Sequence, residues 1–538
     1  MKRGGESMKI LINNIVNRYK YRLLLLQFMS ILDTLAVTLN VYLEGMLLNS
    51  LVYGKDRNNF FRVLVFIIIL SVMRLVFSFF DSKIQILDFR KAILDSNDLV
   101  IEKLYSKDTL EILKKDPIKL TDQIVDDTNE VISFIFQTIS QLISLSLTLV
   151  IILFYLLKAN ITYFWVMLSL LLIYTLCYFF LKPRMYTVNL NLKNKTSEYF
   201  SGLSDWIRRY VEIKGKEELK LNKLNLNTLK QNLLKVGRKD YVLSYIMSTL
   251  QIGIQLIFQI FLFIWGGILV ISGEITIGYF SIVLQYFNQL LDKADEIFSI
   301  LVKVESSRAS YRRLDNLLHL KSEVNGSIKL NKIESISLKN VNISLDQNKY
   351  LFNSPVTYKF ANPGFYTITG KNGIGKSILL RTITGIYNSK VVGNIFINDK
   401  LAEMVDRKDL RKAKLGFLFQ DTGIPTCTVR DYLGNNVTEI KSRLFSQVFS
   451  SEKFNINNIL YKPMDTLSSG ELQLVKLYSA LTKEKVDGLL LDEPLANIYP
   501  SMKRDIVQLL KEFAKDHLVI IISHDEEGLT DEKTLQVE

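Results

Sequence analysis

Eight consecutive residues in the C-terminal third of the chain have the types and spacing of a loop that wraps phosphate groups. They fit the pattern Gly-x-x-x-x-Gly-Lys-Ser and are Gly370, Lys371, Asn372, Gly373, Ile374, Gly375, Lys376 and Ser377, followed by Ile378. The glycines let backbone N–H groups turn toward phosphate oxygens, Lys376 can reach the terminal phosphates, and the Ser377 hydroxyl can ligate magnesium. This segment therefore predicts a site for phosphate and Mg²⁺.

The flanking residues predict the elements that this loop needs. An apolar run, Phe365–Thr369, precedes the loop as a strand, and Ser377–Ile383 follows it as a helix. The positive end of the helix dipole then adds to the attraction for anions.

Three further apolar runs of strand type end in side chains that can do chemistry. They are Phe417–Gln420, Leu489–Glu493 and Val519–His524. We expect Asp492 to hold magnesium and Glu493 to orient or deprotonate water. Gln420 is expected to touch magnesium or the attacking water, and His524 the terminal phosphate. Parallel strands of an α/β sheet deliver their last residues to one edge, so these groups are predicted to gather around the phosphate loop.

A second helix start with small residues and exposed amides lies between these runs. Leu467 precedes Ser468, Ser469, Gly470 and Glu471, which open a helical pattern. A helix that begins in this way is a second candidate for anion binding.

The N-terminal half contains six apolar segments of the length that spans a bilayer. They are Leu23–Leu48, Phe60–Phe80, Val131–Leu156, Ile161–Leu181, Tyr245–Ser272 and Ile277–Ile300. Most basic residues of this half fall in the two long polar stretches between the segments, whereas the short loop Gly273–Thr276 has none. By the positive-inside rule, both termini and both long stretches are predicted to be cytoplasmic. The net charge of +13 then fits loops beside anionic lipid, and no motif or basic stripe indicates a nucleic-acid partner.

Both long polar stretches keep apolar residues at helical spacing, which predicts membrane helices that continue into the cytoplasm and turn back. We expect a short transverse helix at Leu203–Ile207. Trp206 within it is either a packing anchor for a cytoplasmic partner domain or an interfacial membrane anchor, and the polar surroundings favour the first.

Ionisable and amide side chains interrupt the apolar segments. Arg74 either pairs with Asp33 or Glu44 to hold helices together or contacts a substrate. Gln251, Gln255 and Gln259 share one helix face, where they either line a polar pathway or bond to neighbouring helices.

The order of these motifs resembles an ATP-binding cassette domain, and the six segments before it resemble the membrane domain of type I ABC exporters. The fold class that this implies is a six-helix transmembrane domain with long cytoplasmic extensions, joined to an α/β P-loop cassette. The expected boundaries are 1–320 for the membrane domain, 321–332 for a linker and 333–538 for the nucleotide-binding domain.

The resemblance implies a half-transporter that uses ATP and Mg²⁺ as a dimer, with the homodimer favoured over a heterodimer. ATP would lie between the phosphate loop of one cassette and the Leu-Ser-x-Gly signature of the other. Several positions depart from the family pattern. Among them, Ser469 stands where glycine is usual, Glu471 where glutamine is usual, and Tyr499 where aspartate is usual. Leu345 stands where the family has its adenine-stacking aromatic residue, and Tyr350 is a candidate substitute.

The expected function is ATP-driven export of an amphiphilic substrate across a bacterial cytoplasmic membrane, with peptides of the bacteriocin kind first and lipids or drugs second. The altered signature motivates another hypothesis, a membrane sensor or immunity module that binds peptide and ATP with slow turnover. A third hypothesis is one half of a heterodimer whose partner supplies the standard signature.

Overall fold

The computed structural model describes residues 6–54, 57–115, 117–159, 161–217, 219–346, 349–388, 390–420, 423–434, 443–483, 485–523 and 533–537. The chain divides into two compact units. One contains residues 1–102 and 120–318, and the other contains residues 103–119 and 319–538.

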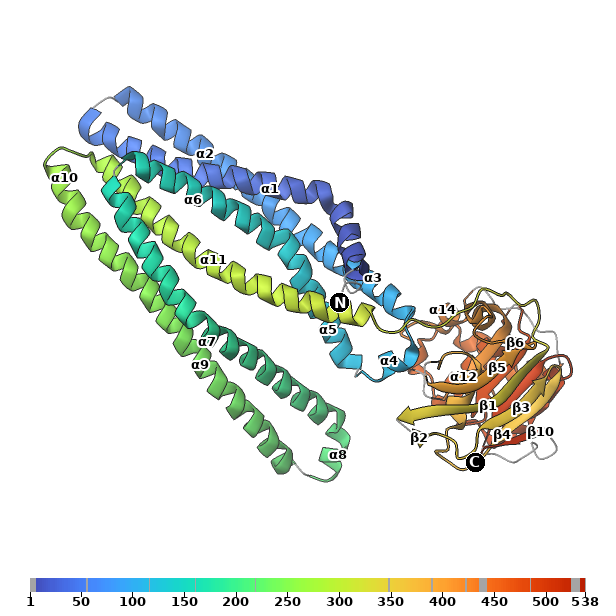
Figure 1. Cartoon of the computed structure of the whole chain (residues 1–538). Coiled ribbons are helices and arrows are strands. Elements are labelled where there is room, and N and C mark those ends of the chain that lie inside the picture. The colour runs from blue at the N-terminus through green and yellow to red at the C-terminus, as the bar shows by residue number, and fades with distance from the viewer. Residues whose placement is uncertain are drawn as a thin grey trace. The chain divides into compact units, whose positions relative to one another are not determined.

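The first unit is built from long helices that pack lengthwise (Figure 1). Its elements are α1 (Glu6–Asn49), η1 (Ser50–Gly54), α2 (Arg57–Lys83), η2 (Ile84–Asp88), α3 (Phe89–Tyr105), α5 (Pro117–Ser133), η3 (Phe134–Thr138), α6 (Ile139–Ala159), α7 (Ile161–Arg208), α8 (Tyr210–Gly215), α9 (Leu219–Phe261), η4 (Leu262–Gly266), α10 (Gly267–Ile271) and α11 (Ile277–Leu318). Helix α1 packs against α2, α6 and α11, and α7 packs along α9. Buried apolar side chains such as Phe258 and Phe287, whose rings stack, form the core of this unit.

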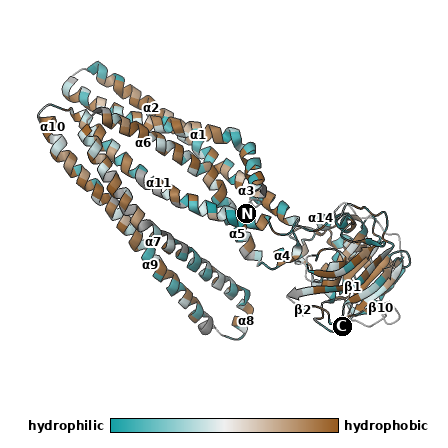
Figure 2. Cartoon of the chain, in the orientation of Figure 1, coloured by the Kyte–Doolittle hydropathy of each residue, from teal (hydrophilic) through white to brown (hydrophobic). Residues whose placement is uncertain are grey.

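Each of the six apolar segments lies in helical structure. Within the described residues, four helical stretches are long and apolar enough to cross a membrane: Met8–Tyr53, Arg57–Tyr105, Leu120–Leu157 and Lys223–Ile271. Figure 2 shows hydrophobic residues concentrated in the part of α9 nearer α10 and hydrophilic residues in the part nearer α8. The helices therefore do extend beyond their apolar parts, as the helical spacing of the polar stretches predicts.

The expected short helix at Leu203–Ile207 is wrong. Helix α7 continues through these residues to Arg208, and the short helix α8 comes afterwards, at Tyr210–Gly215. No proline interrupts Leu203–Ile207, and the N–H of Arg209 still donates to the carbonyl of Asp205, so the helix has no reason to end earlier. Trp206 lies on this last part of α7, with its ring edge-on to Tyr210 of α8.

Two contacts bear on the polar groups of the apolar segments. Arg74 Nε lies 3.0 Å from Asp33 Oδ1, so the arginine on α2 pairs with the aspartate on α1. Gln255 Nε2 donates to Asn288 Oδ1 at 3.2 Å, which joins α9 to α11. Both contacts hold helices together, as polar side chains do in membrane domains.

The second unit carries two β-sheets and the helices that cover them (Figure 1). One sheet has the order β2-β1-β5-β6, with β3 paired to β1, and its strands are antiparallel: β1 (Ser335–Asp346), β2 (Lys349–Tyr350), β3 (Val356–Ala361), β5 (Val391–Ile397) and β6 (Lys400–Leu401). The other has the order β10-β4-β9-β8-β7 and is parallel: β4 (Gly364–Thr369), β7 (Leu415–Leu418), β8 (Gly488–Asp492), β9 (Leu518–Ile522) and β10 (Lys533–Gln536).

The helices of this unit are mostly short. They are α4 (Thr109–Leu113), α12 (Lys376–Ile383), α13 (Arg407–Asp409), η5 (Leu410–Lys414), α14 (Val429–Leu433), α15 (Arg443–Phe449), η6 (Ile456–Ile459), η7 (Met464–Thr466), α16 (Ser469–Leu481) and α17 (Pro500–Phe513). Strands β8 and β9 are buried along their whole length, which explains their unbroken apolar sequences.

The register of the parallel sheet brings the strand ends to one edge. Leu418 lies opposite Leu491, Asp492 opposite Ile522, and Ile368 opposite Ile522. The last residues of β4, β7, β8 and β9 therefore lie side by side, and the loop after β4 begins at this edge.

Residues 103–119, from the last turn of α3 to the first residues of α5, belong to the second unit. Lys107 forms an antiparallel bridge with Ser322, and the N–H of Glu323 donates to the carbonyl of Ser106 at 3.0 Å. Glu323 in turn pairs with Arg411 of η5. The tip of the first long polar stretch and the segment 321–332 are thus packed together in the α/β unit.

Candidate nucleotide-binding site

The phosphate loop connects β4 to α12 in the conformation that its glycines allow. Gly375 precedes the first residue of α12 with φ of 104°, in the left-handed region that favours glycine. A Cβ at this position would collide with the side chain of Leu351, next to β2. Lys376 is buried, and its Nζ donates to the carbonyls of Gly370 at 2.8 Å and Lys371 at 3.1 Å. The ammonium group is therefore held inside the curve of the loop, whereas Asn372 and Gly373 are exposed at its tip and Ile374 and Ile378 pack partly against the core.

The two predicted magnesium ligands lie in contact. Ser377 Oγ donates to Asp492 Oδ1 at 3.0 Å, from the first turn of α12 to the last residue of β8. Asp492 is fully buried, so its carboxylate has a fixed position at the sheet edge. Hydroxyl and carboxylate oxygens suit Mg²⁺, which proteins often hold by one or two such groups together with phosphates. Within the described residues, no cluster of three or more His, Cys, Asp or Glu side chains offers a separate all-protein metal site.

Glu493 follows directly and has an unusual backbone. Its φ is 53°, in the left-handed region that non-glycine residues rarely adopt and that recurs at functional sites. Its N–H donates to the carbonyl of Ile522 at 2.9 Å, and its own carbonyl accepts from Gln473 Nε2 at 2.9 Å. The sheet on one side and α16 on the other therefore hold the residue in this conformation.

Gln473 is a residue of this site that the sequence analysis missed. It lies on α16, five residues after Ser468, and links the helix of the signature to the backbone of Glu493. A polar residue between Leu472 and Leu474 on a half-buried helix is the only signal that could have indicated it.

Ser468 caps α16, and Glu471 completes a capping box with it. Glu471 Oε2 accepts from the Ser468 N–H at 2.9 Å and from its hydroxyl at 2.8 Å, while the Glu471 N–H donates to Ser468 Oγ at 3.2 Å. The hydrogen bond from the Ser468 backbone is the main cause that lowers the pKa of Glu471 below its ordinary value. The glutamate that replaces the usual glutamine thus stabilises the start of this helix.

The other two residues of the segment are placed differently. Ser469 is exposed in the first turn, and Gly470 faces the backbone after β8, since a Cβ there would come within 2.7 Å of the carbonyl oxygen of Asn497. Ser468 and Ser469 are therefore accessible, and Gly470 permits a close approach of two backbone segments.

Of the other two predicted site residues, the structure describes Gln420 alone. Strand β7 ends at Leu418, so Gln420 lies two residues beyond it and is exposed. Strand β9 ends at Ile522, and His524 lies outside the described residues. Tyr350 is half exposed at the end of β2, directly before the Leu351 side chain that lies against Gly375.

Comparison with known families supports the assignment of both parts of the chain. Residues 23–293 match the family model for the ABC transporter transmembrane region, and residues 354–496 match the model for the ABC transporter itself. The chain belongs to the ABC transporter family. This ABC transporter carries its membrane region and its ATP-binding domain in one polypeptide, which is the half-transporter arrangement of exporters. It is a multi-pass membrane protein with an ABC-type ATPase domain.

Some similar proteins match both parts of the chain, and others match one part. The microcin-J25 export ATP-binding/permease protein McjD of Escherichia coli is 23% identical over 340 residues, which cover 61% of this chain and 58% of that protein. The phosphonates import ATP-binding protein PhnC of Lactococcus lactis is 30% identical over 191 residues, 32% of this chain and 70% of that protein, and it aligns with one part alone. A solved structure of a bacterial Atm1-family ABC exporter with ATP bound superposes with a TM-score of 0.81 at 16% identity, covering 97% of this chain and 94% of that chain. This ABC transporter therefore has the exporter fold over nearly its whole length.

Proposed function

We propose that this ABC transporter hydrolyses ATP to export an amphiphilic substrate, with peptides as the leading class, across a bacterial cytoplasmic membrane. The contact between Ser377 and Asp492 carries the proposal, because it places two oxygen ligands for Mg²⁺ beside a phosphate loop in a chain with apolar helices. The similarity of one relative, a microcin export protein, supports a peptide as the substrate.

In the proposed reaction each residue has a separate task. Lys376 and the N–H groups of the loop bind the phosphates, and Ser377 and Asp492 hold Mg²⁺, which neutralises phosphate charge when bound. Glu493 accepts a proton from the attacking water. Gln420 is proposed to contact the metal or that water, and His524 is proposed to contact the terminal phosphate.

We propose that two copies of the chain form the working unit. Ser468 and Ser469 are exposed at the N-terminus of α16, a helix start whose N–H groups and dipole suit the phosphates held by a second copy. Both termini and both polar stretches would then be cytoplasmic, and the cassettes would close on ATP and reopen after hydrolysis.

Reconstitution of the whole chain tests this proposal. Purified protein in proteoliposomes should accumulate a fluorescent amphiphilic peptide only with Mg-ATP, and light-scattering mass measurement should give two copies. A single copy at saturating Mg-ATP, or ATP hydrolysis without movement of any amphiphile, would contradict it.

A slow-turnover sensor is a second candidate, favoured by Ser469 and Glu471 in the signature. In that case the protein in nanodiscs would bind peptide tightly, while vesicles would show no uptake. Robust uptake by this chain alone would exclude both the sensor and the heterodimer half.

A further inference from the structure

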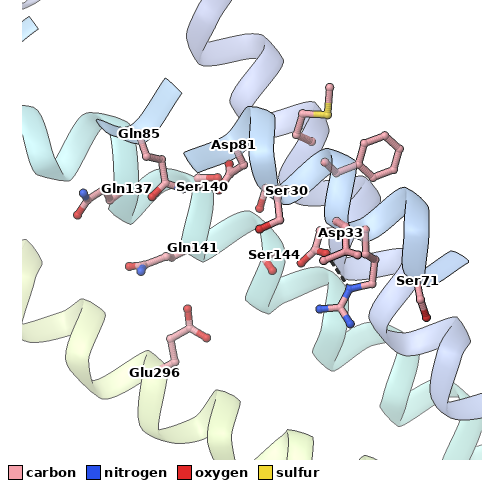
Figure 3. Close-up of a pocket in the computed structure, with 15 residues that line it drawn as sticks. Ser30, Asp33, Ser71, Asp81, Gln85, Gln137, Ser140, Gln141, Ser144 and Glu296 are labelled. Atoms are coloured by element: carbon pink, nitrogen blue, oxygen red, sulfur yellow. Dashed lines mark hydrogen bonds and ion pairs between the residues drawn. The ribbon is translucent and has the colours of Figure 1, made fainter. Parts of the chain in front are cut away.

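A polar cavity lies among the helices of the first unit, and all of its lining residues except Glu296 fall within the stretches that can cross a membrane. Its volume is about 630 Å³, within the range of small-ligand sites. Twelve of its fifteen lining residues are polar or charged, and Figure 3 shows that they come from several helices around a shared space. Polar side chains are costly in a membrane-spanning segment and mark binding sites or pathways there. The cavity therefore has the composition of a ligand site.

Two of the three carboxylates that line this cavity have a cationic partner, and the third has an amide partner. Asp33 of α1 has Arg74 of α2 at 3.0 Å, and Glu296 of α11 has Lys293 at 2.6 Å on the same helix. Asp81 of α2 has an amide partner instead: Gln85 Nε2 donates to its Oδ2 at 2.7 Å. Within the described residues, no cation lies at ion-pair distance from Asp81, and its Oδ1 has no hydrogen bond.

The lysines of α11 near the cavity have other partners. Lys293 contacts Glu296, and Lys303 Nζ donates to Gln141 Oε1 at 3.3 Å. Asp81 is thus the lining carboxylate that lacks a counter-charge in the described part of the chain. A carboxylate in such surroundings is stabilised strongly by an incoming cation, because its own solvation is incomplete.

Two irregular helical turns also line the cavity. Gln85 lies in the π-helical turn η2, and Gln137 lies in the π-helical turn η3, where Ser133 Oγ donates to Gln137 Oε1 at 3.1 Å. Such turns are rare in helices and are frequent at functional sites. Their presence in the lining of the cavity supports a binding role independently of the charges.

We propose that this cavity binds an ammonium or guanidinium group of the transported substrate, with Asp81 as the counter-charge and the serine and glutamine side chains as partners for peptide amides. The inference rests on the proposed function and narrows its substrate class to basic peptides. Arg74 and Asp33 complete the lining as a pair that is already neutral.

Three matched peptides test the proposal on the full chain in nanodiscs. The first is a short amphiphilic peptide with blocked ends and one lysine. The second has that lysine acetylated, and the third has glutamate in its place. We expect the lysine peptide to bind roughly tenfold more tightly than the acetylated one, the effect of one charge-assisted hydrogen bond. Competition with spermidine distinguishes a lysine side chain from a free polyamine as the source of the ammonium group.

Four variants link the preference to Asp81. Asp81→Asn should bind the lysine and acetylated peptides equally, and Asp81→Glu should still prefer the lysine peptide. Asp81→Lys should prefer the glutamate peptide. Glu44→Gln is the control, because Glu44 lies on α1 outside the cavity, where it accepts from Asn40 at 2.9 Å. A monodisperse elution profile and a thermal-unfolding midpoint close to that of the wild type confirm that each variant is folded.

The two proposals fail in different ways. Equal binding of the lysine and acetylated peptides, or a preference retained by Asp81→Asn, would overturn the cation site whether or not the protein transports. Cation-selective binding without ATP-driven uptake in vesicles would overturn export and leave the site standing.

Discussion

The hydroxyl of Ser377 and the carboxylate of Asp492 are joined by a hydrogen bond of 3.0 Å, although 115 positions separate them in the chain. The bond connects the first turn of α12 to the end of β8. It follows from the parallel register, which brings the loop after β4 and the end of β8 to one edge of the sheet with β9 between the two strands.

We expect Ser377→Ala and Asp492→Asn to weaken Mg²⁺ binding. Ser377→Ala removes one oxygen ligand, and Asp492→Asn removes the negative charge of the other. The Mg²⁺ concentration for half-maximal ATPase should therefore rise on the order of tenfold or more. A Mg²⁺ titration at saturating ATP measures this. Ser446→Ala, at an exposed serine of α15, is the matched control and should leave the midpoint unchanged. An unshifted midpoint in Asp492→Asn would reject the assignment.

Glu493→Gln should stop turnover and preserve ATP binding. The amide cannot accept the proton from water, and a loss of roughly 10²- to 10⁴-fold in kcat is typical of a missing general base. Single-turnover hydrolysis and a nucleotide-binding titration separate the two effects. Glu512→Gln on the exposed face of α17 is the control and should leave turnover unchanged. Normal turnover in Glu493→Gln would mean that another group activates water.

Gln473→Ala should lower kcat without changing the KM for ATP. The side chain holds the carbonyl of Glu493 at 2.9 Å, and removal of one such hydrogen bond corresponds to roughly five- to tenfold in rate. Steady-state kinetics give both constants, with Gln508→Ala of α17 as the exposed control. A rise in KM with kcat intact would instead indicate a role in nucleotide binding.

The capping box predicts a pH-dependent contribution to stability. Because the backbone hydrogen bond from Ser468 lowers the pKa of folded Glu471, its stabilisation is present above the ordinary glutamate pKa and is lost as the pH falls through the folded value. Glu471→Gln should therefore destabilise the cassette by about 0.5–1 kcal/mol at pH 7, and this difference should vanish in acid.

Thermal unfolding of wild type and Glu471→Gln across pH 7 to acid conditions measures that difference. Glu452→Gln, at an exposed glutamate, should show no such change with pH. A difference that is constant with pH would mean that the charge of Glu471 does not contribute to the cap.

Local motifs of the cassette could be predicted from sequence because neighbouring residues encode them. The left-handed φ of Gly375 and the start of α12 at Lys376 are properties of a short segment. The apolar strands β8 and β9 are recognisable because burial on both faces demands unbroken apolar runs. The same reasoning found the apolar helices, and it failed at Leu203–Ile207 because helix ends inside long helical stretches have weak signals.

Contacts between distant segments were decided by the tertiary structure alone. The sequence showed that Arg74 needed a partner, and packing of α1 against α2 selected Asp33. Gln473 of α16 reaches the backbone of Glu493, which follows β8. Asp81 lines a cavity where several helices converge, and among the described residues it has no cation at ion-pair distance. Sequence by itself determined which chemistry each segment can perform, since that depends on residue type and local backbone. Which groups meet depends on long-range packing, which no local pattern encodes.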